Sequence, residues 1–121
     1  MKQSIAAEKS YRFAVRIIKL HLYLCKKEKY LLSMSNQLLK SGTSIGANIE
    51  EALGGFSRKE FAAKMSISYK EARETKYWIR LLMDTEILEN RLALSFLADV
   101  DELIKMLASI VKTTTGQVQK T

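Results

Sequence analysis

Apolar residues recur at three- and four-residue intervals in four long segments of the chain. This spacing places them on one face of an α-helix, whereas a strand shows strict alternation. The pattern predicts helices over residues 5–27, 29–53, 58–83 and 89–112. Because each connection between these segments is short, consecutive helices should pack as antiparallel neighbours. The predicted fold is all-α, an antiparallel up-down-up-down four-helix bundle.

The scarcity of turn-forming residues agrees with this fold. The chain has 121 residues, lacks proline and carries four of its five glycines between Gly42 and Gly55. Few turns can form in such a chain, which argues against all-β and α/β architectures. We predict one bundle domain over residues 1–112, followed by a polar, flexible C-terminal tail over residues 113–121.

Glycines mark two places in the second predicted helix. Gly42 and Gly46 lie inside the helical pattern, where each destabilises a helix by about 1 kcal/mol relative to alanine. The small residues around them would let another helix approach closely, and a break near Gly42 is the competing interpretation. Gly54 and Gly55 should end the helix, with one of them in the left-handed conformation.

The third predicted helix has a start signal in Ser57 and Glu60, which fit a capping box. Phe56 and Phe61 have the spacing of a hydrophobic staple around that cap. The residues expected to face the core from the third and fourth helices are Phe61, Met65, Ser68, Ala72, Thr75, Ile79, Leu82, Phe96, Val100, Leu103, Leu107 and Ile110.

The first predicted helix carries two apolar stripes, where a bundle helix needs only one. The stripe expected to face the core is Phe13, Ile17, Leu20 and Leu24. The second stripe is Tyr11, Val15, Ile18, Leu22 and Cys25. Monomers rarely leave such a patch in water, so we predict a homo-oligomer with the second stripe and Trp78 at its interface. A first helix that is central and well covered within one chain is the alternative.

Positive charge is concentrated at the start of the chain. The net charge is +7, and the first 40 residues hold nine lysines and arginines against two acids. Cations at helical spacing neutralise phosphates without reading sequence. The predicted nucleic-acid interface is Lys9, Arg12, Arg16, Lys19, Lys26, Lys27, Arg73, Lys76 and Arg80. A solvated face that only keeps the protein soluble is the alternative.

Few residues in the sequence are candidates for catalysis or metal binding. His21 is the only histidine, so the chain cannot form the paired Glu-x-x-His sites of di-metal bundles. Cys25 is the only cysteine, which excludes an internal disulfide and suits a reducing compartment. We find neither a membrane-spanning run nor a signal peptide, and expect a cytoplasmic protein without membrane contact. We expect no catalytic residues, no metal and no cofactor, and therefore no enzyme.

Residues 38–55, LLKSGTSIGANIEEALGG, contain a specific motif. The positions that form the motif are Ser44, Ile45, Asn48, Ile49, Glu51 and Gly54. Together with KEFAAKMSISYKEARETKYWIRLL at residues 59–82, it resembles the bacterial four-helix-bundle family encoded within intervening sequences of 23S ribosomal RNA genes. The resemblance covers nearly the whole chain and implies an antiparallel bundle. We interpret the motif as structural, with small residues for close helix approach.

The chain is also similar to the accessory variability protein of diversity-generating retroelements, which forms a positively charged pentameric ring and works with a reverse transcriptase and RNA. This similarity suggests a pentamer. Our leading hypothesis is a non-enzymatic oligomeric bundle that binds RNA or DNA non-specifically through its basic face. The alternative is an oligomeric protein-interaction scaffold without a direct nucleic-acid role. An enzyme is the third possibility, and it would need a pocket that brings several acids to His21.

Overall fold

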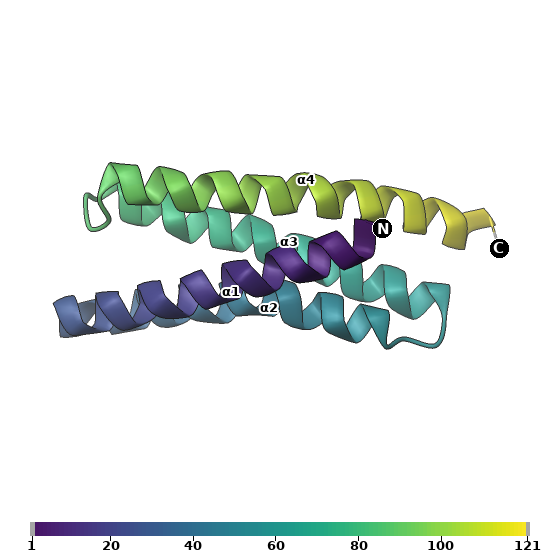
Figure 1. The fold of residues 1–121 in the computed structure, drawn as a ribbon, viewed down its shortest axis with the longest axis horizontal. Coiled ribbons are helices and arrows are strands. Elements are labelled where there is room, and N and C mark those ends of the chain that lie inside the picture. The colour runs from purple at the N-terminus through teal and green to yellow at the C-terminus, as the bar shows by residue number, and fades with distance from the viewer. Residues whose placement is uncertain (1, 121) are drawn as a thin grey trace.

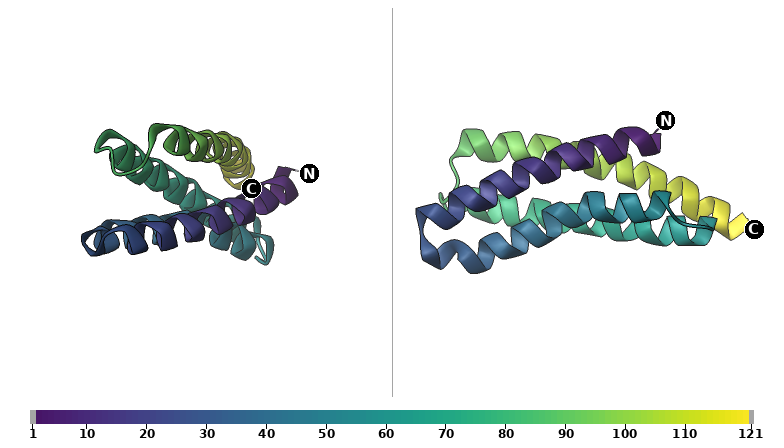
Figure 2. Two further views of the ribbon diagram at one scale, coloured as in Figure 1. Left: turned by 60° about the vertical axis from the view of Figure 1, so that its left-hand side comes forward. Right: turned by 60° about the horizontal axis from the view of Figure 1, so that its bottom comes forward.

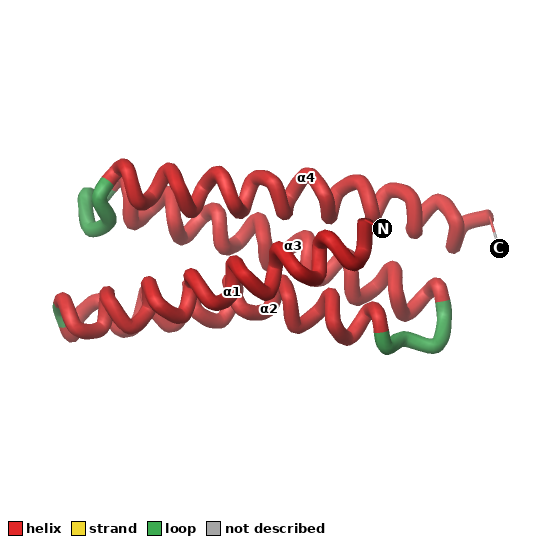
Figure 3. Tube along the Cα trace, in the orientation of Figure 1, coloured by secondary structure: helices red, strands yellow, loops and turns green. Residues whose placement is uncertain are grey.

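Helices account for nearly all of the chain in the computed structural model, which describes residues 2–120 and the side chains of residues 3–116. Along the described residues, four α-helices and one short 3₁₀ turn follow one another (Figure 1). They are α1 (Lys2–Lys27), η1 (Lys29–Leu31), α2 (Leu32–Leu53), α3 (Arg58–Asp84) and α4 (Asn90–Lys120). The connections between them lie at the two ends of the bundle (Figure 3).

The helices form the predicted antiparallel four-helix bundle. Helices α2 and α3 lie side by side, as do α3 and α4, and α1 packs against α2. The contact between α1 and α4 is much less extensive, because these two helices cross instead of running alongside each other (Figure 2). Helices α1 and α3 both adjoin α4 and make no close backbone contact with each other.

The buried core matches the predicted stripes closely. Phe13, Ile17, Leu20 and Leu24 of α1 are buried, as are Val100 and its neighbours on the α4 stripe. Of the α3 stripe, all positions are buried except Phe61, which is partly exposed at the start of the helix. Phe13 and Phe96 meet edge to face at the crossing of α1 and α4, with ring centroids 6.2 Å apart.

The glycines inside α2 allow α1 to approach closely. Helix α2 is continuous through Gly42, so the interpretation of a break there is wrong. A Cβ atom at Gly42 would lie 2.8 Å from two side-chain carbons of Ile17, and one at Gly46 would lie 3.2 Å from Oγ of Ser10. Carbon atoms pack at about 3.5–4.0 Å, so only glycine fits against Ile17 in this arrangement.

The α2–α3 interface is held by small polar residues as well as by apolar ones. The buried hydroxyl of Ser68 donates to the carbonyl of Ile45 across the interface at 2.7 Å. The buried hydroxyls of Thr75 and Ser41 lie 3.0 Å apart and hydrogen-bond to each other. Because short hydroxyl side chains satisfy each other here, the two helices can pack closely without leaving polar atoms unpaired.

The turn between α2 and α3 differs from the prediction in two respects. Gly54 ends α2 at φ −88° and ψ 0°, and no glycine in the described chain has a positive φ, so the predicted left-handed glycine is wrong. The hydroxyl of Ser57 accepts from the amide of Glu60 at 3.1 Å, as a cap requires. Phe56 is 99% exposed, so the predicted hydrophobic staple does not form.

The C-terminal helix is longer than predicted. Helix α4 continues to Lys120, whereas the apolar pattern ended at residue 112. Thr114 explains part of the extension, because its side chain is buried in the bundle. Its hydroxyl donates to the carbonyl of Ile110 at 2.9 Å, so the buried hydroxyl is paired. The polar composition that indicated a tail is thus compatible with a helix whose threonine bonds back to the preceding turn.

Candidate nucleic-acid interface

The nine predicted cationic residues do not form one continuous face. Six lie on α1 and three on α3, and these helices flank α4 on its two sides. Lys9 and Arg16 reach α4 from one side, and Lys76 reaches it from the other. Each basic helix therefore presents its own cations to solvent.

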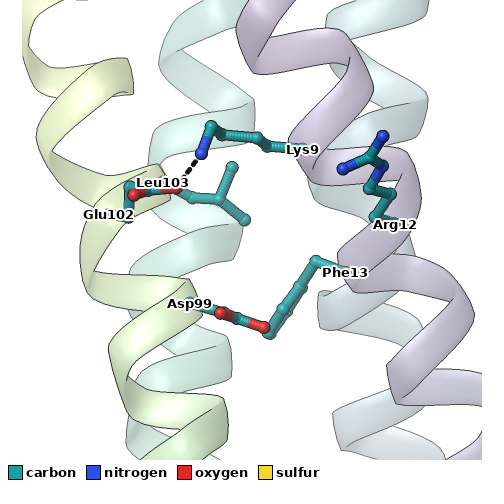
Figure 4. A pocket seen from close by; sticks show the side chains of 6 residues that line it. All are labelled: Lys9, Arg12, Phe13, Asp99, Glu102 and Leu103. Atoms are coloured by element: carbon teal, nitrogen blue, oxygen red, sulfur yellow. Dashed lines mark hydrogen bonds and ion pairs between the residues drawn. The ribbon is translucent and has the colours of Figure 1, made fainter.

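Acidic residues of α4 neutralise part of this charge. Nζ of Lys9 lies 2.6 Å from the carboxylate of Glu102, which it reaches across the gap between the helices (Figure 4). The guanidinium of Arg16 pairs with Asp99, and Nζ of Lys76 lies 2.7 Å from the carboxylate of Asp101. Arg12 pairs within α1 with Glu8 at 2.6 Å. The sequence indicated only Glu8 beside the first basic stripe, because the acids of α4 lie more than eighty residues away.

Arg16 is the most constrained of these cations. Its Nη2 donates to Oγ of Ser95 at 3.0 Å, in addition to the ion pair with Asp99. Its Cζ lies 4.1 Å from the centroid of the Phe96 ring, which is the arrangement of a cation–π contact. The guanidinium plane is therefore held in place on the edge of the core.

Five of the nine cations have no acidic partner among the described residues: Lys19, Lys26, Lys27, Arg73 and Arg80. Lys27 donates to the carbonyl of Ile87 at 3.0 Å, which leaves its charge uncompensated. On α3, Nη1 of Arg73 lies 3.4 Å from the hydroxyl of Tyr69. Lys19 and Lys26 are exposed on α1 with the exposed Tyr23 between them, and we call these three residues the Lys19–Lys26 strip.

A pocket adjoins this strip where α1 and α4 diverge. It has a volume of about 250 Å³ and is lined by Arg16, Lys19, Leu20, Tyr23, Leu92 and Phe96. The sequence predicted Arg16 and Lys19 as part of a binding surface and placed Leu20 and Phe96 in the core, but it assigned nothing to Tyr23 and Leu92. Tyr23 could have been recognised because it is an aromatic residue within the basic arc of α1, whereas Leu92 and Phe96 reach the pocket only through tertiary packing.

A second pocket between α1 and α4 is less suitable for an anion. It has a volume of about 180 Å³ and is lined by Lys9, Arg12, Phe13, Asp99, Glu102 and Leu103 (Figure 4). Two carboxylates face two cations across it, so the charges of its walls nearly cancel. A phosphate placed there would meet repulsion from Asp99 and Glu102 as well as attraction.

The second apolar stripe of α1 is exposed in the single chain. The exposed fractions are 70% for Tyr11, 45% for Ile18 and 55% for Leu22, and Val15 is also exposed. The alternative of a central, well-covered first helix is therefore wrong. Cys25 is partly buried at the end of the stripe.

Trp78 does not lie next to this stripe. It is partly buried on α3, where its Nε1 donates to the carboxylate of Glu74 at 3.2 Å and its ring packs against Tyr77. Trp78 lies on α3 and the stripe on α1, and these two helices make no close backbone contact.

His21 has hydrogen-bonding neighbours on α1 and α2. Its Nδ1 lies 2.8 Å from Oγ of Ser35 on α2, and Sγ of Cys25 lies 3.6 Å from its Nε2. Within the described side chains, no group of three or more histidine, cysteine, aspartate or glutamate residues is placed to hold a metal ion.

The motif residues make contacts that stabilise α2 and its packing. Ile45 and Ile49 are buried, and the side-chain amide of Asn48 donates to the carbonyl of Ser44 at 2.8 Å. The hydroxyl of Ser44 donates in turn to the carbonyl of Lys40. At the end of α2, Glu51 pairs with Lys64 of α3 at 2.9 Å, and Gly54 is the C-cap.

One carboxyl group is electrostatically perturbed. Partial burial raises the pKa of Glu71 on α3 above its ordinary value, and the nearby carboxylate of Glu74 adds to the increase. Lys40 of α2 lowers the pKa and opposes both effects. This group lies on α3, apart from the cations of α1.

One family model and a solved structure match this chain over most of its length. The model of the 23S rRNA-intervening sequence protein family matches residues 2–109. A crystal structure at 1.70 Å, of a protein with unknown function from the S23 ribosomal protein family of Bacteroides thetaiotaomicron, is similar to this chain with a TM-score of 0.88 and 46% sequence identity. The match covers 93% of this chain and 99% of that one. No curated protein matches the sequence.

In the part of the chain that the structure describes, no helix combines the length and the apolar character needed to span a bilayer.

Proposed function

Because the chain belongs to the 23S rRNA-intervening sequence protein family, we propose that it is a non-enzymatic, cytoplasmic, oligomeric four-helix bundle that binds RNA or DNA through phosphate contacts. The Lys19–Lys26 strip carries this proposal. Its two lysines stand on one exposed face of α1, and neither has an acidic partner among the described residues. Arrangements of this kind bind phosphates without sequence preference.

The ion pairs divide the nine predicted nucleic-acid-binding cations into those that are already paired with acids and those that are not. Lys9, Arg12, Arg16 and Lys76 are already paired with acids, so binding a phosphate would require them to exchange partners. Lys19 and Lys26 can bind without this exchange. We therefore assign the first contacts to the C-terminal half of α1, with Lys27 beside the strip, and secondary contacts to Arg73 and Arg80 on α3.

Oligomer formation would repeat the strip by symmetry. The exposed stripe Tyr11, Val15, Ile18 and Leu22 supports a self-association surface, because monomers rarely leave such a continuous apolar patch in water. A closed ring, with the pentamer suggested by the retroelement similarity as the expected form, would present several strips at once. Linked weak contacts raise the overall affinity well above that of one strip.

The proposal is tested by measuring the affinity for a labelled single-stranded RNA over a range of salt concentrations. We expect the logarithm of the binding constant to fall linearly with the logarithm of the salt concentration. The K19E/K26E variant should bind more weakly, with a salt slope reduced by about one for each lysine that contacts a phosphate. The matched control is K105E/K112E, which places the same charge change on two exposed positions of α4. Absence of binding at low salt would refute the proposal.

A protein-interaction scaffold is the second candidate, and the same exposed stripe of α1 favours it. In that case the stripe would recruit a different protein, and nucleic acid would be incidental. Partners that are captured from a native lysate after nuclease treatment, and lost in an I18E/L22E variant, would support the scaffold. If light scattering gives the mass of a monomer at micromolar protein concentration, the oligomer is refuted in both proposals.

A further inference from the structure

We propose that the pocket between α1 and α4 lined by Arg16, Lys19, Leu20, Tyr23, Leu92 and Phe96 holds one unpaired nucleobase, so that the protein prefers single-stranded nucleic acid to a duplex. The inference rests on the proposed function, because it assigns a class of nucleic acid to the same face of α1. We call this site the base pocket.

The size and position of the base pocket favour a compact, planar occupant. It lies beyond the crossing at Phe13 and Phe96, between the Arg16–Asp99 ion pair and the hydrogen bond from Lys27 to Ile87. Its volume of about 250 Å³ is below the range of about 300–1,000 Å³ that is usual for drug-sized ligands. An amphipathic helix instead needs a groove for anchors spread over two turns.

The walls of the base pocket have the chemistry that bases use for stacking. Leu20 and Phe96 are buried and form an apolar floor. The guanidinium of Arg16 is fixed over Phe96 by Asp99 and Ser95, and its other face is a planar cationic surface. The exposed ring of Tyr23 stands at the rim. Bases that leave a stack are commonly bound on aromatic rings and on guanidinium planes.

The cations around the base pocket are placed for the phosphates of the same strand. Lys19 lines the pocket, and Lys26 lies one turn of α1 beyond Tyr23. A strand that inserts one base beside Tyr23 can therefore keep its backbone along the Lys19–Lys26 strip. A duplex would first have to unpair and unstack that base, which costs a few kcal/mol.

The test compares three probes of equal length: a single-stranded RNA, the same strand with abasic sites, and a duplex. Phosphate contacts alone would bind the first two strands equally. With the base pocket occupied, we expect the intact single strand to bind about 5- to 150-fold more tightly than the abasic strand, and more tightly than the duplex. The Y23A variant should lose this difference and still bind the abasic strand.

Further variants separate base stacking on Tyr23 from the effects of changing any exposed tyrosine or of misfolding. Y23F keeps an aromatic ring and should keep the discrimination. Y30A is the matched control, since Tyr30 is an exposed tyrosine that does not line the pocket. Circular dichroism checks that each variant remains helical.

Three outcomes would overturn the inference. Equal, salt-dependent affinity for intact and abasic strands would refute the base pocket and leave the proposed function standing. Absence of binding to any of the three probes at low salt would refute both. If an acidic amphipathic peptide binds in a Tyr23-dependent way while the strands are not discriminated, the pocket belongs to a protein partner and not to a base.

Discussion

Helix α1 is packed in opposite ways on its two sides. Towards α2 the backbones approach closely, because Gly42 leaves room for Ile17 and Gly46 leaves room for Ser10. Towards α4 the helices cross once at Phe13 and then diverge, and ion pairs and pockets replace continuous apolar packing. The comparison indicates that the α1–α2 side provides stability, whereas the α1–α4 side leaves charged and aromatic groups available for binding.

The largest effect should come from removing the side chain that fills the close contact. Ile17 is fully buried against Gly42, so I17A should lower the free energy of unfolding by about 2–5 kcal/mol. Urea denaturation followed by circular dichroism measures this change. The control is L92A on the α4 side, where partial exposure should limit the loss to well below that of I17A. Equal losses of unfolding free energy for the two variants would contradict the conclusion that the α1–α2 side contributes more stability than the α1–α4 side.

A bulky residue in the same contact should have the next largest effect. G42V places methyl groups where a Cβ alone would already lie 2.8 Å from Ile17, so we expect a loss of about 1–3 kcal/mol from overpacking. G46A meets Ser10 at 3.2 Å and gains helix propensity, so its effect should be smaller. Melting temperatures of the two variants test the order. A G42V protein as stable as the wild type would show that the helices are not closely packed at this point.

The ion pairs on the α4 side should contribute less to stability. Arg16 is partly exposed, and exposed ion pairs are typically worth about 0–1 kcal/mol. D99N removes the charge partner of Arg16 without removing its side-chain bulk. We expect a loss below about 1 kcal/mol in low salt and a smaller one in high salt. A loss as large as that of I17A would mean that the α1–α4 side also determines stability.

The smallest effect is expected at Glu71, on the side of the bundle away from the α1–α4 opening. Its pKa is raised in the folded state, mainly by burial, so the folded protein favours the protonated carboxyl. Above the folded-state pKa, the ionised carboxylate of Glu71 therefore lowers the free energy of unfolding. This loss of stability disappears below the unfolded-state pKa of about 4.3. E71Q should be slightly more stable than the wild type at pH 7. This advantage should vanish as the pH falls below that value, as measured by thermal melts across pH.

The fold followed from the apolar pattern because the strongest signals were local. The spacing of Phe13, Ile17 and Leu20 predicted the buried face of α1, and Ser57 with Glu60 predicted the start of α3. The end of α4 was missed because its last turns are polar, although Thr114 bonds back to the helix. The left-handed glycine was wrong because Gly54 ends α2 with a right-handed backbone.

The candidate site was only partly predictable, because it depends on how distant helices meet. The cations of α1 were identified from the sequence, but their partners Asp99 and Glu102 come from the other end of the chain. The base pocket depends on the crossing of α1 and α4, and helical periodicity does not encode a crossing angle. Tyr23 was visible as an aromatic residue among cations, although its place at the rim of a pocket was not.

The central claim is that the open side of α1 binds nucleic acid, and lysine footprinting tests it most directly. The protein is treated with a lysine-acetylating reagent with and without a saturating single-stranded RNA, and the modified residues are identified by mass spectrometry. We predict that RNA protects Lys19 and Lys26 and leaves the exposed Lys105 and Lys112 of α4 as reactive as before. Equal modification of Lys19 and Lys26 with and without bound RNA would contradict the claim.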